Sequence, residues 1–184
     1  MCGARPVFAD VDPATATIDP ADVLAKVTPK TKAVIGVHLY GQPCDAGAVR
    51  DICDEKGLVF IEDAAQAHGA EYRGKRTGAL GDLACFSFYA TKNLATGEGG
   101  MVTTGSDEYD QHLRRLINHG QSEKYLHTEL GYNYRMTDIN AAIGRVQLAK
   151  LGGFNRRRQE NAAYYGTHIR SEERRVGKEC SLPC

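Results

Sequence analysis

The sequence predicts an α/β fold in which a mostly parallel sheet is flanked by helices. Short apolar runs rich in β-branched and aromatic residues alternate with stretches that have a helical period, and this alternation is typical of strand–helix repeats. The chain has 184 residues, which is enough for one such domain with a substantial core. No internal repeat is present, so we expect one domain of this class.

Five short runs are predicted strands because each is apolar and is bounded by turn-forming residues. They are Val7–Val11, Ala33–Leu39, Leu58–Glu62, Ala84–Phe88 and Gly100–Thr104.

A first helix is predicted between the second and third strands. Asp45 is a suitable N-cap, Val49, Ile52 and Cys53 share one face, and Gly57 is a suitable C-terminal stop.

Two further helices follow the last strand. One begins after Ser106 and ends at Gly120, and the next runs from Thr137 to about Lys150, with a helical pattern that continues through Tyr164 and Tyr165. Between them, residues 121–136 are rich in Tyr, His and Asn and are predicted to be irregular. Long loops of this kind tend to be functional or to be held by a partner.

Composition excludes several functions. The 23 basic and 23 acidic side chains balance, and the cluster at residues 156–158 is interpreted as a solvated helix face, so no nucleic-acid partner is expected. No apolar run approaches the roughly 18 residues of a membrane span, and the first residues lack the apolar core of a signal peptide. Isolated cysteines without CxxC spacing, and histidines without i, i+4 pairing, predict neither disulfides nor a metal site. The cytoplasm is the expected compartment.

The two ends are unlike natural ends. The chain opens almost directly into a predicted strand, so we expect Met1 to be an internal methionine of a longer protein. Residues 170–180 resemble the conceptual translation of a sequencing-adapter oligonucleotide, although a polar helix tail is the alternative. We therefore expect residues 1–169 to be a partial domain, truncated at both ends, and residues 170–184 to be a non-native tail.

Two segments place chemically useful side chains at the end of a predicted strand. Glu62 and Asp63 end the third strand, at the edge where open α/β sheets bind ligands, although Asp63 as a simple helix cap is the alternative. The next segment delivers Ser87 and Lys92 to the same edge. A lysine at this position is suited to forming a Schiff base with a cofactor. The alternative is a structural lysine whose aliphatic part packs on apolar surface while its ammonium reaches solvent. Together, lysine, carboxylate and hydroxyl are the groups that pyridoxal 5′-phosphate (PLP) requires.

Longer motifs resemble one family. The strings at residues 37–43, 62–69, 86–93, 97–101 and 131–136 resemble those of the DegT/DnrJ/EryC1/StrS aminotransferases, and the resemblance covers residues 1 to about 169. These are fold-type I PLP enzymes that aminate nucleotide-linked keto-sugars. The resemblance implies that residues 1–169 are part of a PLP-binding large domain.

The resemblance also implies a role for each matching residue. Lys92 matches the lysine that carries PLP covalently and moves protons during the reaction. Asp63 matches the partner of the pyridine nitrogen, Gln66 the residue near the ring and its phenolic oxygen, and Ser87 a phosphate ligand. Asn133 matches an asparagine that reaches the phosphate of the neighbouring subunit's cofactor, which implies a homodimer.

The resemblance implies a nucleotide-sugar substrate and an amino-acid donor, with glutamate expected. Lysine at position 92, where the family's sugar dehydratases have histidine, favours transamination. His38, Tyr40 and His68 receive no catalytic role, since a buried histidine is more often a structural hydrogen-bonding group.

Several matters stay open. The family's first phosphate-binding element and its small C-terminal domain have no counterpart here, so turnover by this chain is in question. A different PLP enzyme, such as a desulfurase or lyase, and an inactive fragment or interaction module are the alternatives.

Overall fold

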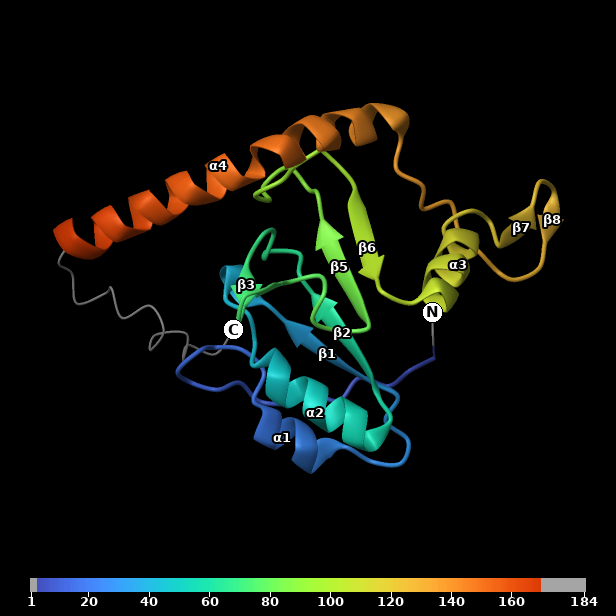
Figure 1. The fold of residues 1–184 in the computed structure, drawn as a ribbon. Coiled ribbons are helices and arrows are strands. Elements are labelled where there is room, and N and C mark those ends of the chain that lie inside the picture. Colours follow the sequence, from blue (N-terminus) through green and yellow to red (C-terminus); the bar gives the residue numbers. More distant parts are fainter. Residues whose placement is uncertain (1–2, 170–184) are drawn as a thin grey trace.

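A four-stranded sheet lies at the centre of the computed structural model, which describes residues 3–169. It contains β1 (Ala33–Val37), β2 (Val59–Asp63), β5 (Leu83–Ser87) and β6 (Gly100–Thr104), in the order β1-β2-β5-β6. The first three strands are parallel and β6 is antiparallel to β5 (Figure 1). The predicted α/β class is confirmed, and these four strands begin and end within two residues of the predicted bounds.

The prediction of a strand at Val7–Val11 is wrong. Only an isolated bridge between Val11 and Ile18 forms there, and Phe8 is 85% exposed. A run of β-forming residues becomes a strand only where a neighbouring strand accepts its hydrogen bonds, and the four-stranded sheet ends at β1 and β6.

Helices α1 (Pro20–Lys26) and α2 (Ala46–Lys56) cover one face of the sheet (Figure 1). α2 has the predicted caps: the Asp45 side chain accepts a hydrogen bond from a first-turn backbone N–H, and Gly57 adopts a left-handed conformation. α1 was not predicted. Its start signal is nevertheless present, because Asp19 caps the helix and a proline follows at the first helical position.

The hydrophobic core lies between these helices and the sheet. Along each strand, alternate residues face it, so Phe60 is fully buried while Ile35 and Val37 on the opposite face of the sheet are exposed. The core cluster consists of Val23, Val34, Cys44, Ala46, Val49, Cys53, Leu58, Phe60 and Leu80.

Replacing Phe60 with alanine should lower the free energy of unfolding by about 3–5 kcal/mol, because it leaves a cavity at the centre of this cluster. Phe8→Ala is the matched control and should change it by less than about 0.5 kcal/mol. Urea unfolding of both variants measures the difference. Equal effects of the two substitutions would contradict the assignment of the core.

Helix α4 (Asp138–His168) crosses the carboxyl ends of the central strands (Figure 1). Asn140 Nδ2 donates to the carbonyl of Glu98 at 2.9 Å, and Asn155 Nδ2 donates to the carbonyl of His68 at 2.8 Å. The sequence predicted a helix that ends near Lys150 and, beyond it, a helical pattern that reaches Tyr164 and Tyr165. In the structure both stretches belong to one continuous helix. Within residues 3–169, no helix is both long and apolar enough to span a membrane.

The other elements connect these layers. Helix α3 (Asp107–Leu116) begins after Ser106 as predicted but ends one turn before Gly120. The segment predicted to be irregular contains a small hairpin, β7 (Gln121–Glu123) and β8 (Leu126–His127), and is irregular beyond it. The remaining elements are η1 (Leu39–Gly41), β3 (Glu71–Tyr72) and β4 (Lys75–Arg76).

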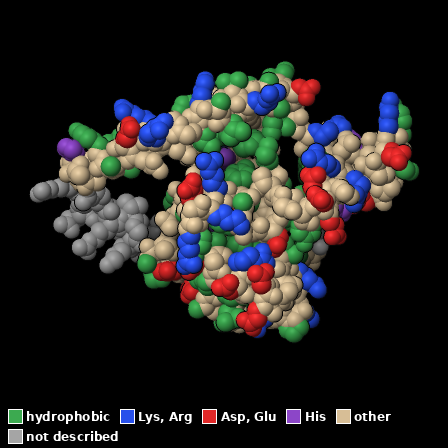
Figure 2. All heavy atoms as spheres, viewed as in Figure 1, with side chains coloured by type: hydrophobic (Ala, Val, Ile, Leu, Met, Phe, Trp, Pro, Cys, Tyr) green, Lys and Arg blue, Asp and Glu red, His purple; other side chains and the backbone are tan. Residues whose placement is uncertain are grey.

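Charged side chains of both signs are interspersed over α2 and α3, whereas hydrophobic side chains gather where α4 crosses the end of the sheet (Figure 2). The predicted non-native tail at 170–184 lies outside the described residues.

Candidate active site

The carboxyl ends of β1, β2 and β5 meet at one edge of the sheet. In the observed register, Asp63 lies between Val37 of β1 and Cys85 of β5. Asp63 is the last residue of β2 and Ser87 is the last residue of β5. Two of the predicted site residues therefore lie on neighbouring strands, at the edge where open α/β sheets bind ligands.

The Asp63 carboxylate is half-buried and keeps one oxygen available. Its Oδ1 accepts a hydrogen bond from the Ala65 backbone N–H at 3.0 Å, while Oδ2 has no hydrogen-bond partner among residues 3–169. Turns rather than a helix follow β2, so the alternative that Asp63 caps a helix is excluded. Burial, together with the nearby Asp63 charge, raises the pKa of the Cys85 thiol.

Lys92 lies in the loop that joins β5 to β6. The loop is closed by backbone hydrogen bonds from Phe88 N to Gly99 O (2.8 Å) and from Thr96 N to Phe88 O (2.9 Å). The Lys92 ammonium makes no hydrogen bond or ion pair within the described part of the chain. Burial lowers the pKa of His68, the hydrogen bond to Ser87 opposes this shift, and the charge of Lys92 adds to it.

His68 connects the turn after β2 to the end of β5. Its Nε2 lies 2.8 Å from the Ser87 carbonyl oxygen, to which it donates. Its Nδ1 is buried and has no partner among the described residues. The Ser87 hydroxyl accepts from the Tyr89 backbone N–H at 3.3 Å. His68 is thus a buried, hydrogen-bonded residue, as expected.

Gln66 lies one turn after Asp63 at an open cavity of about 640 Å³. Its Oε1 accepts a hydrogen bond from the Tyr40 backbone N–H at 2.9 Å. His68, Asn93 and Asn155 also line this cavity, which lies between the turn and helix α4.

The structure does not bring Asn133 to the other predicted site residues. Asn133 is exposed in the segment between β8 and α4, and its backbone pairs with Asn118 just after α3. It contacts neither Asp63, Ser87 nor Lys92 within the described chain.

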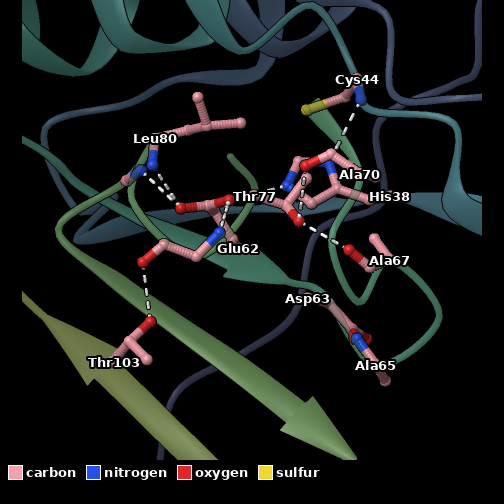
Figure 3. A network of polar contacts seen from close by, with 12 residues as sticks. His38, Cys44, Glu62, Asp63, Ala65, Ala67, Ala70, Thr77, Leu80 and Thr103 are labelled. Carbon is pink, nitrogen blue, oxygen red and sulfur yellow. Dashed lines mark hydrogen bonds and ion pairs between the residues drawn. The ribbon is translucent and has the colours of Figure 1, made fainter. Parts of the chain in front are cut away.

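Sequence reasoning missed a buried network around Glu62 (Figure 3). Glu62 and His38 are both fully buried. Glu62 Oε2 accepts from His38 Nε2 (2.9 Å) and Gly78 N (2.8 Å), and Oε1 accepts from Leu80 N and Gly81 N (both 2.7 Å). The prediction placed both carboxylates of β2 at the ligand edge, but only Asp63 is available there. Strand alternation was the signal that could have separated the two residues.

Substituting glutamine for Glu62 should destabilise the fold by about 3 kcal/mol at neutral pH, because an amide nitrogen then faces N–H donors. Burial alone would raise the pKa of Glu62, but the bonds from His38 and the three backbone groups lower it. This stability is therefore present above the unfolded pKa of about 4.3 and is lost as the pH falls through the lowered native value.

Urea unfolding of wild type and Glu62→Gln between pH 7 and pH 3 measures this effect, and the two curves should converge in acid. If the difference in unfolding free energy between the two proteins stays constant with pH, the charge of the Glu62 carboxylate is not what holds the backbone at residues 78–81.

The fold and site define an α/β protein with a lysine-bearing loop and a free carboxylate oxygen at the carboxyl edge of the sheet. The sequence profile of the DegT/DnrJ/EryC1/StrS aminotransferase family matches residues 1–180. The chain belongs to this family.

Similarity to individual proteins supports this family membership. A pleiotropic regulatory protein of Geobacillus stearothermophilus is 51% identical over 164 residues, covering 89% of this chain and 44% of the relative. The dTDP-3-amino-3,4,6-trideoxy-α-D-glucose transaminase of Streptomyces venezuelae is 47% identical over 164 residues, covering 89% and 43%. The crystal structure of S. venezuelae DesV in complex with a ketimine intermediate has a TM-score of 0.86 at 47% identity and covers 89% and 44%. The chain thus spans less than half the length of these relatives.

Proposed function

We propose that the protein containing this chain is a PLP-dependent aminotransferase that acts on a nucleotide-linked keto-sugar, with glutamate as the amino donor. The observation that carries the proposal is the placement of Asp63 and Ser87 at one sheet edge, with Lys92 on the loop that follows. Family membership and the transaminase among the relatives support the same reaction class.

The available groups fit the cofactor. A carboxylate with an unpaired oxygen suits a protonated pyridine nitrogen, an amine without a partner suits a Schiff base, and a strand-end hydroxyl suits a phosphate. When bound, PLP supplies an electron sink for bond breaking at the substrate carbon. Asp63 would hold the ring proton, Gln66 would lie by the ring oxygen, and Ser87 would bind the phosphate.

Lys92 has two tasks in this proposal. Its Nζ would hold the cofactor, and its amine, when free, would move a proton at the substrate carbon. The absence of any ion pair to Lys92 within residues 3–169 supports this role, because a partner would have to be displaced first.

The test is a chimera in which the matching 164 residues of this chain replace their counterparts in the S. venezuelae transaminase. With glutamate and that enzyme's keto-sugar nucleotide, the chimera should transaminate. Release of sulfide from cysteine instead would favour the desulfurase alternative. A folded chimera that loads PLP and catalyses neither reaction would contradict the proposal.

Asn133 is proposed to act on the cofactor phosphate of the neighbouring subunit in a homodimer. Its exposed position, away from Asp63 and Lys92, supports an action between subunits. Inactive Lys92→Ala and Asn133→Ala chimeras, when mixed and reassembled, should regain activity, because one site of each mixed dimer then has both residues intact. If Asn133 acts within its own subunit, mixing restores nothing. Cytoplasmic location stays a prediction.

A further inference from the structure

The side chains of Glu62 and Asp63 diverge at the end of β2. Consecutive strand residues face opposite sides of a sheet, so Glu62 enters the interior while Asp63 points away from the network (Figure 3). Within the described residues, the four hydrogen bonds to the Glu62 carboxylate all come from outside β2. Fixing the Glu62 side chain therefore fixes the strand end from which Asp63 projects.

The segment that begins at His38 holds the same strand end at two further points. The His38 backbone N–H donates to the Asp63 carbonyl oxygen at 3.0 Å, and the Tyr40 N–H donates to Gln66 Oε1 at 2.9 Å. Glu62, Asp63 and Gln66 are thus each bound by residues 38–40.

The orientation of the His38 ring is set on both sides. The Cys44 backbone N–H donates to Nδ1 at 3.2 Å, so Nδ1 carries no proton and Nε2 donates its proton to Glu62. Because His38 is fully buried, it cannot touch a ligand and must act through its neighbours.

We propose that His38 and Glu62 form a positioning pair that sets the placement of Asp63 and Gln66 against the pyridine ring of PLP. This inference rests on the proposed function. Neither residue is a catalytic residue. Glu62 fixes the position of the end of β2, and His38 connects Glu62 to residues 38–40, whose backbone N–H groups bind Asp63 and Gln66.

The test uses the S. venezuelae chimera loaded with PLP that carries ¹⁵N at the ring nitrogen. His38→Leu removes both ring hydrogen bonds at similar volume, and His38→Gln restores an N–H donor toward Glu62. Val49→Ala is the control, because it weakens the core without touching this network.

His38→Leu should weaken PLP binding between about tenfold and 100-fold, the range for residues that orient metal ligands and so act in the same indirect way. Its ring-nitrogen signal should move toward that of neutral pyridine, although Lys92 still forms its adduct. His38→Gln should recover most of both effects, and Val49→Ala should change only stability. A His38→Leu chimera with the affinity and signal of the unsubstituted chimera overturns this inference alone, whereas an unsubstituted, folded chimera that takes up no PLP overturns the proposed function with it.

A second measurement needs no variant. The ¹H–¹⁵N spectrum of wild type should show His38 protonated at Nε2 and bare at Nδ1. A proton on Nδ1 would overturn the proposal even if His38→Leu fails to fold.

Discussion

Replacing Lys92 with alanine in the S. venezuelae chimera is expected to lower the transamination rate by about 10⁴-fold, the upper end of the range for a positioned acid–base group. A large loss is expected because, in the proposed mechanism, this one side chain would both hold the cofactor and move the proton. Single-turnover kinetics with excess PLP measures the chemical step without the contribution of weakened cofactor binding.

Lys30→Ala is the matched control. Lys30 lies in the turn before β1, at the opposite edge of the sheet, and its loss should leave the rate within about twofold, as for surface substitutions away from special features. A Lys92→Ala chimera that keeps a tenth of the activity would contradict the role given to this lysine.

Replacing Asp63 with asparagine should lower the rate by about 10²- to 10³-fold, the cost of removing one preorganised electrostatic group. Asparagine keeps the size and the acceptor for Ala65 N but removes the charge that, in the proposed mechanism, would hold a proton on the pyridine nitrogen. The rate with saturating PLP measures the effect, and the ¹⁵N signal of the ring nitrogen shows whether that proton is lost.

Asp51→Asn is the control for this substitution, because Asp51 is exposed on α2 and lies outside the site. If Asp63→Asn keeps both the rate and a protonated ring nitrogen, the charge of Asp63 has no part in the reaction.

The strands of the sheet could be predicted because each is a short apolar run that ends in turn-forming residues. Parallel topology then explains why Asp63 and Ser87 meet at one edge, since the carboxyl ends of parallel strands coincide. Val7–Val11 has the same local pattern and forms no strand, because periodicity does not say whether a neighbouring strand is present. α1 was missed because seven residues are too few to show a helical period, although its caps were visible.

The Glu62 network could be predicted only in part. Strand alternation separates Glu62 from Asp63, but the backbone donors at Gly78, Leu80 and Gly81 lie 16 to 19 residues further along the chain, in the loop that follows β4. No local pattern reports where such a loop folds back. The position of Asn133 likewise depends on tertiary packing.

Borohydride reduction followed by peptide mapping tests the central claim most directly. Reduction converts a Schiff base between PLP and a lysine into a stable secondary amine, which mass spectrometry locates to a residue. Our account predicts that the label lies on Lys92 of the PLP-treated S. venezuelae chimera and is absent from its Lys92→Ala variant. A label on another lysine, or no label on a folded chimera, would contradict it.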